Sequence, residues 1–430
     1  MEKNFYMYQG WIISVFPCFD YPYPALFCQE RKGWSKMQAF TFYSPTKIIF
    51  GKGAEEKTSE QIKAFGGSRI LIIYGGGSII RSGLLARMEA LLKQANLPYA
   101  LFGGVQPNPL LSHAEKGVEE AAAFRADFIL AIGGGSVIDT AKAIAIGAAN
   151  PGQTLWDFWE KKASPKQALP VGVILTIPAA GSEMSDSAVL TNTELGSKRG
   201  LSGDWNRPKF AVMNPELTYT LPPFQIACGI TDIMMHTLDR YFTTQQGNGL
   251  TDEIAEGLLR DVMANGRKAM ENPKDYDAMS ELMWCSSISH NGLTGLGGIK
   301  DFAVHQLGHT LSARFGTAHG ASLSAVWGAW ANYVMDSDPS RFARYGRHVL
   351  GLTGEDDQKT ATAAIELTVS YFSQLGMPVS LGGLEQGILS EEMLMELTDI
   401  CLYRGGRESI GTFKKLERGD IYEIYRAANR

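Results

Sequence analysis

Short strand-like runs alternate with segments of helical spacing in the first half of the chain. The strand-like runs, most of them apolar at successive positions, cover residues 69–74, 99–102, 128–132 and 171–176. Strands that are apolar on both faces are buried on both faces, and helical segments between them, at 84–94 and 139–149, are typical of a parallel sheet. We therefore predict an α/β fold with a parallel sheet for the region from residue 40 to residue 215.

The pattern of residues changes after Pro215. Pro222 and Pro223 open a long stretch rich in Ala, Leu, Met, Glu and Arg, and this composition predicts helices nearly to the end of the chain. A length of 430 residues also favours more than one core. We expect an α/β domain over residues 37–219 and an all-helical domain over residues 220–430.

Residues 1–36 fit neither pattern. They are rich in aromatic residues and proline and have no sustained periodicity. They also lack the basic segment and the small-residue cleavage site of a signal peptide. We expect them to be a non-native or disordered extension, so a chain begun at Met37 should stay soluble and active.

Charge and cysteine usage exclude several classes of protein. A net charge of −5 without any basic cluster argues against nucleic acid and anionic membranes as partners. The sequence contains no apolar run of about 18 residues, the length that a membrane-spanning helix needs. The cysteines are scattered and form no CxxC pair, so we expect a cytoplasmic protein without a disulfide framework or a zinc ribbon.

Two glycine-rich turns follow predicted strands. Residues 133–136 (GGGS) stand between a buried strand and a helix, where glycines allow a phosphate to approach the backbone and the helix N-terminus offers free N–H groups. A tight turn without a ligand is the alternative, but three consecutive glycines exceed what a turn needs. Residues 75–78 (GGGS) form a second such turn, suited to another part of the same nucleotide.

Histidines are few and concentrated in the second half. Asp232 and His236 stand four residues apart, as do His305 and His309, so each pair shares one helix face, and His319 follows closely. Carboxylate and neutral imidazole together suit Fe²⁺ or Zn²⁺. The other histidines lack this spacing and are expected to be structural: His113, His290 and His348.

An ordered set of motifs gives the chain a family resemblance. The motifs are IFGKG at 49–53, GGGSVID at 133–139, PAAGSE at 178–183, DxxxH at 232–236, HQLGH at 305–309 and HG at 319–320. Together they resemble the iron-containing (group III) alcohol dehydrogenase family, in particular its butanol-dehydrogenase-like aldehyde reductases, over residues 38–430. The resemblance implies a Rossmann-like dinucleotide-binding domain, an all-helical metal-binding domain, and hydride transfer between a nicotinamide cofactor and a small alcohol or aldehyde. It also implies a homodimer.

The resemblance assigns roles to individual residues. Four would bind the metal, namely Asp232, His236, His305 and His319. His309 would lie near the substrate without being a ligand, and would either relay a proton or orient a ligand. Cofactor contacts are expected from Gly76, Gly77, Ser78, Asn108, Gly133, Gly134, Gly135, Ser136, Asp139, Thr176 and Lys198.

Two positions depart from the family pattern, and a third feature concerns the cofactor. Ala180 stands where many relatives have a threonine, and His290 where an apolar residue is expected. The turn at 75–78 has no acidic residue, whereas NAD-preferring relatives have one there to bind the ribose 2′-hydroxyl. We therefore expect NADP(H), with Arg81 either near the 2′-phosphate or facing solvent.

Two other functions are compatible with this plan. One is a metal- and NAD-dependent lyase of the dehydroquinate-synthase type, whose polyanionic substrate would need several basic residues near the metal motifs. Only Arg240, Lys300 and Arg314 stand near those motifs, which favours a neutral substrate. The other is a catalytically silent nucleotide-binding protein, which would bind no metal.

Overall fold

The computed structural model describes residues 7–8, 11–12, 37–245 and 247–430. Residues 1–36 and 37–430 are separate units. In the first, β1 (Met7–Tyr8) pairs antiparallel with β2 (Trp11–Ile12). The expectation about residues 1–36 falls almost entirely outside the described residues.

Fully buried β-branched and leucine side chains form the central strands of residues 37–430. In the described part of the chain, one sheet has six parallel strands in the order β3-β10-β7-β6-β4-β5. Their bounds are β3 Lys47–Phe50, β4 Ile70–Tyr74, β5 Tyr99–Phe102, β6 Phe128–Gly133, β7 Val171–Leu175 and β10 Phe210–Met213. The predicted parallel α/β sheet is thereby confirmed, and the strands found in addition are the four-residue β3 and β10.

Alternate residues of these strands face two separate apolar layers. On one face Ile70, Ile72 and Leu130 pack with α1 (Thr58–Ala64) and α3 (Leu84–Gln94). On the other face Leu71, Ile73 and Ile129 pack with α4 (Leu111–Phe124) and α5 (Gly135–Ala149). Both faces are covered, which explains why β6 and β7 contain no polar side chain.

The sheet reverses its direction of growth between β4 and β6. The chain passes from β4 outward to the edge strand β5, then returns to place β6 on the other side of β4. Both glycine turns therefore lie side by side at the carboxyl ends of adjacent strands. This is the place where open α/β sheets bind ligands.

Helix α5 begins earlier than expected. The sequence pattern suggested a start at Asp139, whereas the helix begins at Gly135, with Gly134 as the preceding cap residue. The carbonyl of Gly134 accepts from the N–H of Ile138 at 3.1 Å. The glycines are thus part of the first turn, and their N–H groups belong to the helix N-terminus.

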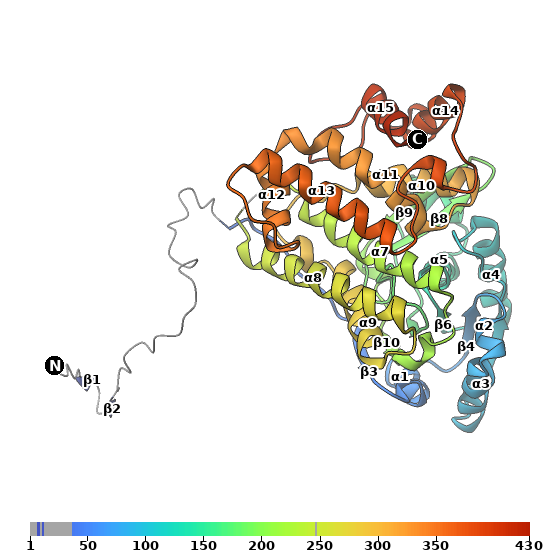
Figure 1. Ribbon diagram of the computed structural model, residues 1–430. Helices are drawn as coiled ribbons and strands as arrows, with labels where there is room; N and C mark the ends of the chain where they lie inside the picture. Colours follow the sequence, from blue (N-terminus) through green and yellow to red (C-terminus); the bar gives the residue numbers. More distant parts are fainter. Residues whose placement is uncertain (1–6, 9–10, 13–36, 246) are drawn as a thin grey trace. The chain divides into compact units, whose positions relative to one another are not determined.

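A helical part follows the sheet, as predicted. Its helices are α7 Pro223–Tyr241, α8 Gly249–Glu271, α9 Tyr276–His290, α10 Ala303–Phe315, α11 His319–Val334, α12 Pro339–His348, α13 Asp357–Gln374, α14 Glu391–Cys401 and α15 Arg418–Ala428. They gather on one side of residues 37–430, with the sheet on the other (Figure 1). Short elements connect the parts: α2 Ser78–Arg81, α6 Leu155–Trp159, and the 3₁₀ turns at 54–57, 204–206, 215–218, 293–295, 335–337, 381–383 and 403–405.

A two-stranded hairpin outside the main sheet was not expected from the sequence. Strands β8 (Ser187–Asn192) and β9 (Ser197–Ser202) pair antiparallel between β7 and β10 in the chain. The hairpin brings Lys198 toward the carboxyl ends of the parallel strands. A domain boundary near 219–220 would fall between β10 and α7, and it stays a prediction.

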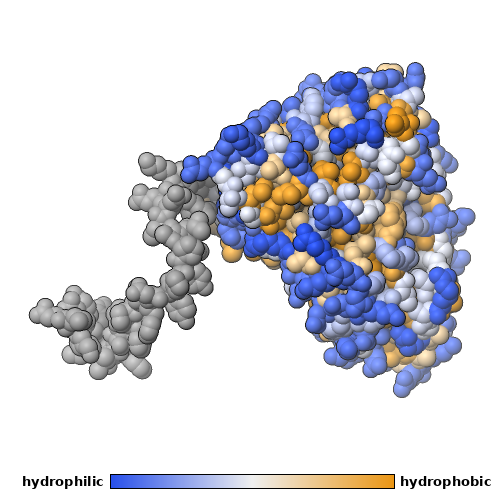
Figure 2. All heavy atoms as spheres, viewed as in Figure 1, coloured by the Kyte–Doolittle hydropathy of each residue, from blue (hydrophilic) through white to orange (hydrophobic). Residues whose placement is uncertain are grey.

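The visible face of residues 37–430 mixes hydrophilic groups with smaller hydrophobic patches (Figure 2). None of the described helices has the length and apolar character that crossing a membrane requires.

Candidate active site

A cavity of about 1050 Å³ lies where the carboxyl ends of the central strands meet helices α7, α10 and α11. It brings together residues from Gly75 to Arg407, more than three quarters of the length of the chain. The predicted site residues in its lining are Gly76, Ser78, Asn108, Gly133, Gly134, Gly135, Ser136, Asp139, Thr176, Lys198, Asp232, His236, His305, His309 and His319. Gly77 is the one predicted residue that is not in the lining.

The β6–α5 turn requires glycines because neighbouring side chains leave no space for a Cβ atom. A Cβ atom on Gly134 would lie 2.1 Å from Cγ2 of Ile177, and one on Gly133 would lie 2.6 Å from Cγ2 of Val137. No real Cβ atom approaches so closely, so the segment after β7 packs directly on the turn. The N–H groups at the start of α5 consequently face the cavity without side chains between, as a phosphate site requires.

The β4–α2 turn is more open. A Cβ atom on Gly76 would have no atom within 4 Å, whereas one on Gly77 would lie 2.5 Å from Nη1 of Arg81. The guanidinium of Arg81 thus folds back over the turn that lacks an acidic residue.

Asp139 acts on neighbouring loops as well as lining the cavity. One oxygen of its carboxylate accepts from the hydroxyl of Ser182 at 2.6 Å, and the other accepts from the N–H of Val189 at 2.9 Å. It therefore fastens α5 to the segment after β7 and to the hairpin.

Lys142 supports the cavity without lining it, and sequence reasoning missed it. Five oxygens of Ser182, Ser185 and Ser187 lie 2.7–3.2 Å from its buried ammonium, which shares its three N–H donors among them. Burial lowers the pKa of Lys142 to about 8, against the attraction of Asp139. Two charged residues three positions apart in an Ala- and Ile-rich helix were the available signal.

Lys198 and Asn108 form a buried pair between the two halves of the cavity. The ammonium of Lys198 donates to Oδ1 of Asn108 at 2.8 Å, and burial lowers the pKa of Lys198 to about 8. The amide of Asn108, whose φ of 56° is left-handed, donates to the carbonyl of Thr317 at 3.3 Å. The pair therefore connects the hairpin to the segment that precedes His319.

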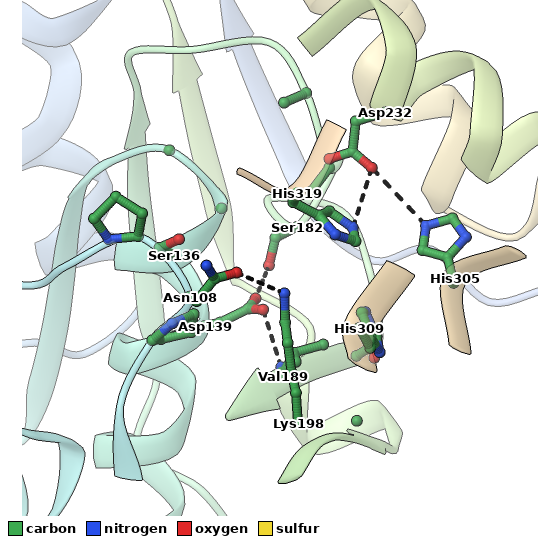
Figure 3. A pocket seen from close by; sticks show the side chains of 18 of the residues that line it. Asn108, Ser136, Asp139, Ser182, Val189, Lys198, Asp232, His305, His309 and His319 are labelled. Atoms are coloured by element: carbon green, nitrogen blue, oxygen red, sulfur yellow. Dashed lines mark hydrogen bonds and ion pairs between the residues drawn. The ribbon is translucent and has the colours of Figure 1, made fainter. Parts of the chain in front are cut away.

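Three imidazole nitrogens approach one carboxylate oxygen of Asp232. Its Oδ1 lies 3.4 Å from Nε2 of His236, 3.9 Å from Nε2 of His305 and 3.5 Å from Nε2 of His319. Figure 3 shows His305 and His319 facing this oxygen. Atoms of Asp232, His305 and His319 lie within 4.8 Å of one another, a grouping that does not include His236.

The donor set fits a divalent cation. Ligands about 2.1 Å from a tetrahedral metal ion lie roughly 3.4 Å apart, which matches these separations. Oδ1 of Asp232 and Nε2 of His305 are buried without a hydrogen-bond partner. Burial raises the pKa of Asp232 to about 6 and lowers the pKa of His236 well below its ordinary value. Neutral imidazoles are the form that binds a metal.

Asp239 orients one of these imidazoles, and it too was missed from the sequence. Its carboxylate accepts from Nδ1 of His305 at 2.5 Å, which leaves Nε2 with a free lone pair toward Asp232. Such a carboxylate–histidine pair fixes the tautomer and the ring orientation of a ligand. The spacing of one helix turn after His236 was its only signal.

His309 lies beside the predicted ligands. Its ring centroid is 6.0 Å from that of His305 and 5.3 Å from that of His319, and its Nδ1 is buried without a hydrogen-bond partner. Its position agrees with a role next to the substrate, and its exclusion from the ligand set stays a prediction.

The two departures from the family pattern contact each other. Nδ1 of His290 lies 2.5 Å from the carbonyl oxygen of Ala180, and its ring stacks on His236 with centroids 4.0 Å apart. A carbonyl only accepts, so Nδ1 carries the proton. His290 thus joins α9 to the segment after β7, and it lines the cavity, where a purely structural role was expected.

The family models match both halves of the chain. The model described as iron-containing alcohol dehydrogenase matches residues 45–215, and the model of the C-terminal part of that family matches residues 226–429. The chain belongs to the iron-containing alcohol dehydrogenase family. The family resemblance that the motifs indicated is thereby confirmed. The predicted activity, that of an alcohol or aldehyde oxidoreductase with a nicotinamide cofactor and a metal, is confirmed as well.

Similar members of the iron-containing alcohol dehydrogenase family differ in their named cofactors. NADH-dependent butanol dehydrogenase A of Clostridium acetobutylicum is 39% identical over 392 residues, 91% of this chain and 99% of that protein. NADPH-dependent aldehyde reductase YqhD of Escherichia coli is 37% identical over 348 residues, 80% of this chain and 89% of that protein. The crystal structure of NADH-dependent butanol dehydrogenase A from Thermotoga maritima has a TM-score of 0.88 at 35% identity and covers 92% of this chain and 100% of its own.

The first prediction concerns the close approach of α11 to α7 beside the metal ligands. A Cβ atom on Gly320 would lie 2.5 Å from the carbonyl oxygen of Cys228. Gly320→Ala should therefore push α11 away and separate His319 from Asp232, at a cost of about 1–3 kcal/mol in unfolding free energy. Melting temperature and metal content after dialysis against a chelator measure both effects.

Gly257→Ala is the matched control, because a Cβ atom there in α8 would meet its nearest neighbour at 3.7 Å. It should keep the metal and stay within about 1 kcal/mol of the original stability. Equal metal retention in the two variants would contradict the prediction.

Proposed function

We propose that this chain reduces small aldehydes with NADPH and uses one divalent metal ion, Fe²⁺ or Zn²⁺. The proposed ligands are Asp232, His236, His305 and His319. One observation carries the proposal: three imidazole nitrogens converge on a buried oxygen of Asp232 inside the cavity that also contains the glycine turns. Dehydroquinate-type lyase chemistry has no comparable support, because the matched family is that of alcohol dehydrogenases.

When bound, the metal supplies Lewis-acid polarisation of the carbonyl oxygen, and the nicotinamide supplies the hydride. The residues of the chain do the rest. The carboxylate of Asp239 holds the ring of His305 in the tautomer that offers Nε2. The start of α5 offers N–H groups to the pyrophosphate, and Ser78 and Thr176 line the same cavity.

His309 is proposed to relay a proton to the reduced oxygen, taking up another from solvent as it gives one away. Its neutral form is favoured because burial holds the pKa of His309 well below its ordinary value, with Lys198 and His305 adding to this effect. It therefore passes on a proton rather than storing one. Its alternative role is to orient the neighbouring ligands.

NADP(H) is the proposed cofactor rather than NAD(H). The turn after β4 has no carboxylate that would repel a 2′-phosphate, and the guanidinium of Arg81 lies beside it. Relatives of both cofactor types match the chain, so the argument rests on this turn.

We further infer that residues 37–219 and 220–430 are separate domains with the cofactor between them, and that the chain forms a homodimer in the cytoplasm. Strand β3 supports the dimer because it lies at the edge of the sheet, where its outer backbone groups are open to pairing. The side chains of Phe40, Phe42 and Tyr43, just before it, are exposed.

The ligand assignment predicts different outcomes for two neighbouring histidines. His305→Ala removes one of the four proposed ligands and leaves the Asp239 carboxylate without its imidazole donor, so metal affinity should fall by more than the roughly 10–100-fold typical of losing an outer partner. His309→Ala should retain the metal while kcat falls roughly 100-fold, the size of a proton-transfer contribution. Metal stoichiometry and steady-state rates measure both, and equal metal loss would disprove the assignment.

The cofactor assignment predicts a switch at Gly76, which lines the cavity and has room for a side chain. The original chain should have the higher kcat/KM with NADPH. Gly76→Asp should shift the NADPH/NADH ratio toward NADH by about 10-fold or more, the scale of a charged hydrogen bond. Gly76→Asn, of equal size and no charge, should shift it much less. An original preference for NADH would rule the assignment out.

The dimer predicts a sedimenting mass of twice the 47.0 kDa of one chain. Phe42→Lys should lower the mass toward one chain, because a buried lysine disfavours association. Ile388→Lys, at an exposed position on the helical part, should leave it unchanged. A monomeric original chain would refute the dimer.

A further inference from the structure

Arg240 and Lys300 are two cations of the cavity lining that form no ion pair with any described residue. Arg240 follows His236 by one turn of α7 and is only 3% exposed. Its Nη1 donates to the carbonyl of His236 at 2.5 Å, while its Nε is buried without a partner. Within the described part of the chain, no carboxylate oxygen lies within 4.0 Å of this guanidinium.

Lys300 is the second cation. It precedes α10, lines the same cavity, and makes no side-chain hydrogen bond or ion pair with any described residue. Desolvation at the cavity wall lowers the pKa of Lys300, and the positive charge of Arg240 lowers it further, although part of the Lys300 residue stays exposed to solvent. Asp239 is the carboxylate that attracts Arg240 most strongly, and Asp186 attracts both cations, but Asp239 already accepts from His305 and Asp186 lies 3.7 Å from Arg207.

Phe302 locates this pair beside the metal ligands. The guanidinium carbon of Arg240 lies 4.8 Å from the ring centroid of Phe302, and that ring lies 5.2 Å from His305 and 6.3 Å from His236. A molecule with its carbonyl at the ligands would therefore extend past the phenyl ring toward the two cations.

Three other basic groups in the lining are already engaged, and a fourth, Lys161, is exposed to solvent. Lys198 donates to Asn108, Arg199 lies 3.7 Å from Glu160, and Arg407 donates to Gln306. Arg314, the third basic residue near the metal motifs, pairs with Glu396 at 3.3 Å and is not in the lining. The guanidinium of Arg240 is buried, the ammonium of Lys300 is exposed to solvent in the same cavity, and both are therefore available to an anionic group of a ligand.

We propose that Arg240 and Lys300 form a subsite for an anionic group, and that the preferred substrate is a short aldehyde with a carboxylate or similar anion at its far end. This inference rests on the proposed aldehyde reductase function and narrows its substrate class. It revises the expectation of a neutral substrate, which rested on how few basic residues surround the metal motifs. Two well-placed cations suffice for one carboxylate.

The experiment uses the full chain loaded with metal, with saturating NADPH and three aldehydes. The aldehydes are 4-oxobutanoate, its uncharged methyl ester, and butanal. In the original chain kcat/KM for 4-oxobutanoate should exceed that for the ester by about 10-fold or more, as a charge-assisted hydrogen bond provides. Lys300→Met and Arg240→Gln should each lower this ratio about 10-fold.

Controls separate the subsite from other effects. Lys209→Met removes an exposed lysine outside the lining and should leave the ratio unchanged. Metal content checks Arg240→Gln, because Arg240 contacts the backbone of a ligand, and the ratio of two substrates cancels any common loss of activity. The Kd of NADPH should not change in Lys300→Met.

Each contrary outcome has a distinct meaning. Reduction of butanal and of the ester without any preference for 4-oxobutanoate would overturn the subsite and leave the aldehyde reductase function standing. A preference that persists in both variants would also overturn it. Weaker NADPH binding in Lys300→Met, with the ratio intact, would assign the cations to a cofactor phosphate instead. Failure to reduce all three aldehydes with either cofactor would reject the proposed function itself.

Discussion

The carboxylate of Asp232 is almost completely removed from solvent, and three imidazoles from α7, α10 and α11 crowd one of its oxygens. Burying these groups without partners for their lone pairs opposes folding. A divalent cation turns the same arrangement into a favourable one, because its charge replaces the lost hydration. The packing of the three helices around this point, including the close contact of Gly320 with α7, follows from the need to bring these atoms together.

On the side of the cavity formed by the sheet, the buried ammonium of Lys142 holds the neighbouring loops in place. Lys142 gathers the oxygens of the segment that follows β7, and Asp139, one turn earlier in α5, holds the hydroxyl of Ser182 and the backbone of the hairpin. The charged side chains of Lys142 and Asp139 therefore hold the loop that packs on the glycine turn. Without these contacts the glycine turn would be free to change conformation, and its N–H groups would no longer point into the cavity.

The hydrophobic pattern and the residue spacing predicted much of this structure. The rest depended on contacts between residues that are far apart in the sequence. The run at 128–132 was recognisable as a buried strand because every position in it is apolar. Strands β3 and β10 have four residues each, too few for a periodicity to stand out. The proposed metal ligands include pairs that share helix faces at fixed spacing, so they could be named from the sequence, whereas Asp239 contacts His305, 66 positions away. The direction of Arg240 and Lys300 into the cavity likewise depends on helix packing that no local pattern encodes.

The pair formed by Asn108 and Lys198 has a thermodynamic consequence. Asn108 accepts from the hairpin lysine and donates to the carbonyl of Thr317, two residues before the imidazole of His319. A ligand that draws Lys198 toward itself therefore changes the support of the segment that precedes His319. Free-energy linkage makes such an effect mutual: if the dinucleotide draws Lys198 and the metal is held by His319, each changes the affinity of the other by the same factor. Binding of the dinucleotide at one end of the cavity then changes the affinity for the metal at the other end.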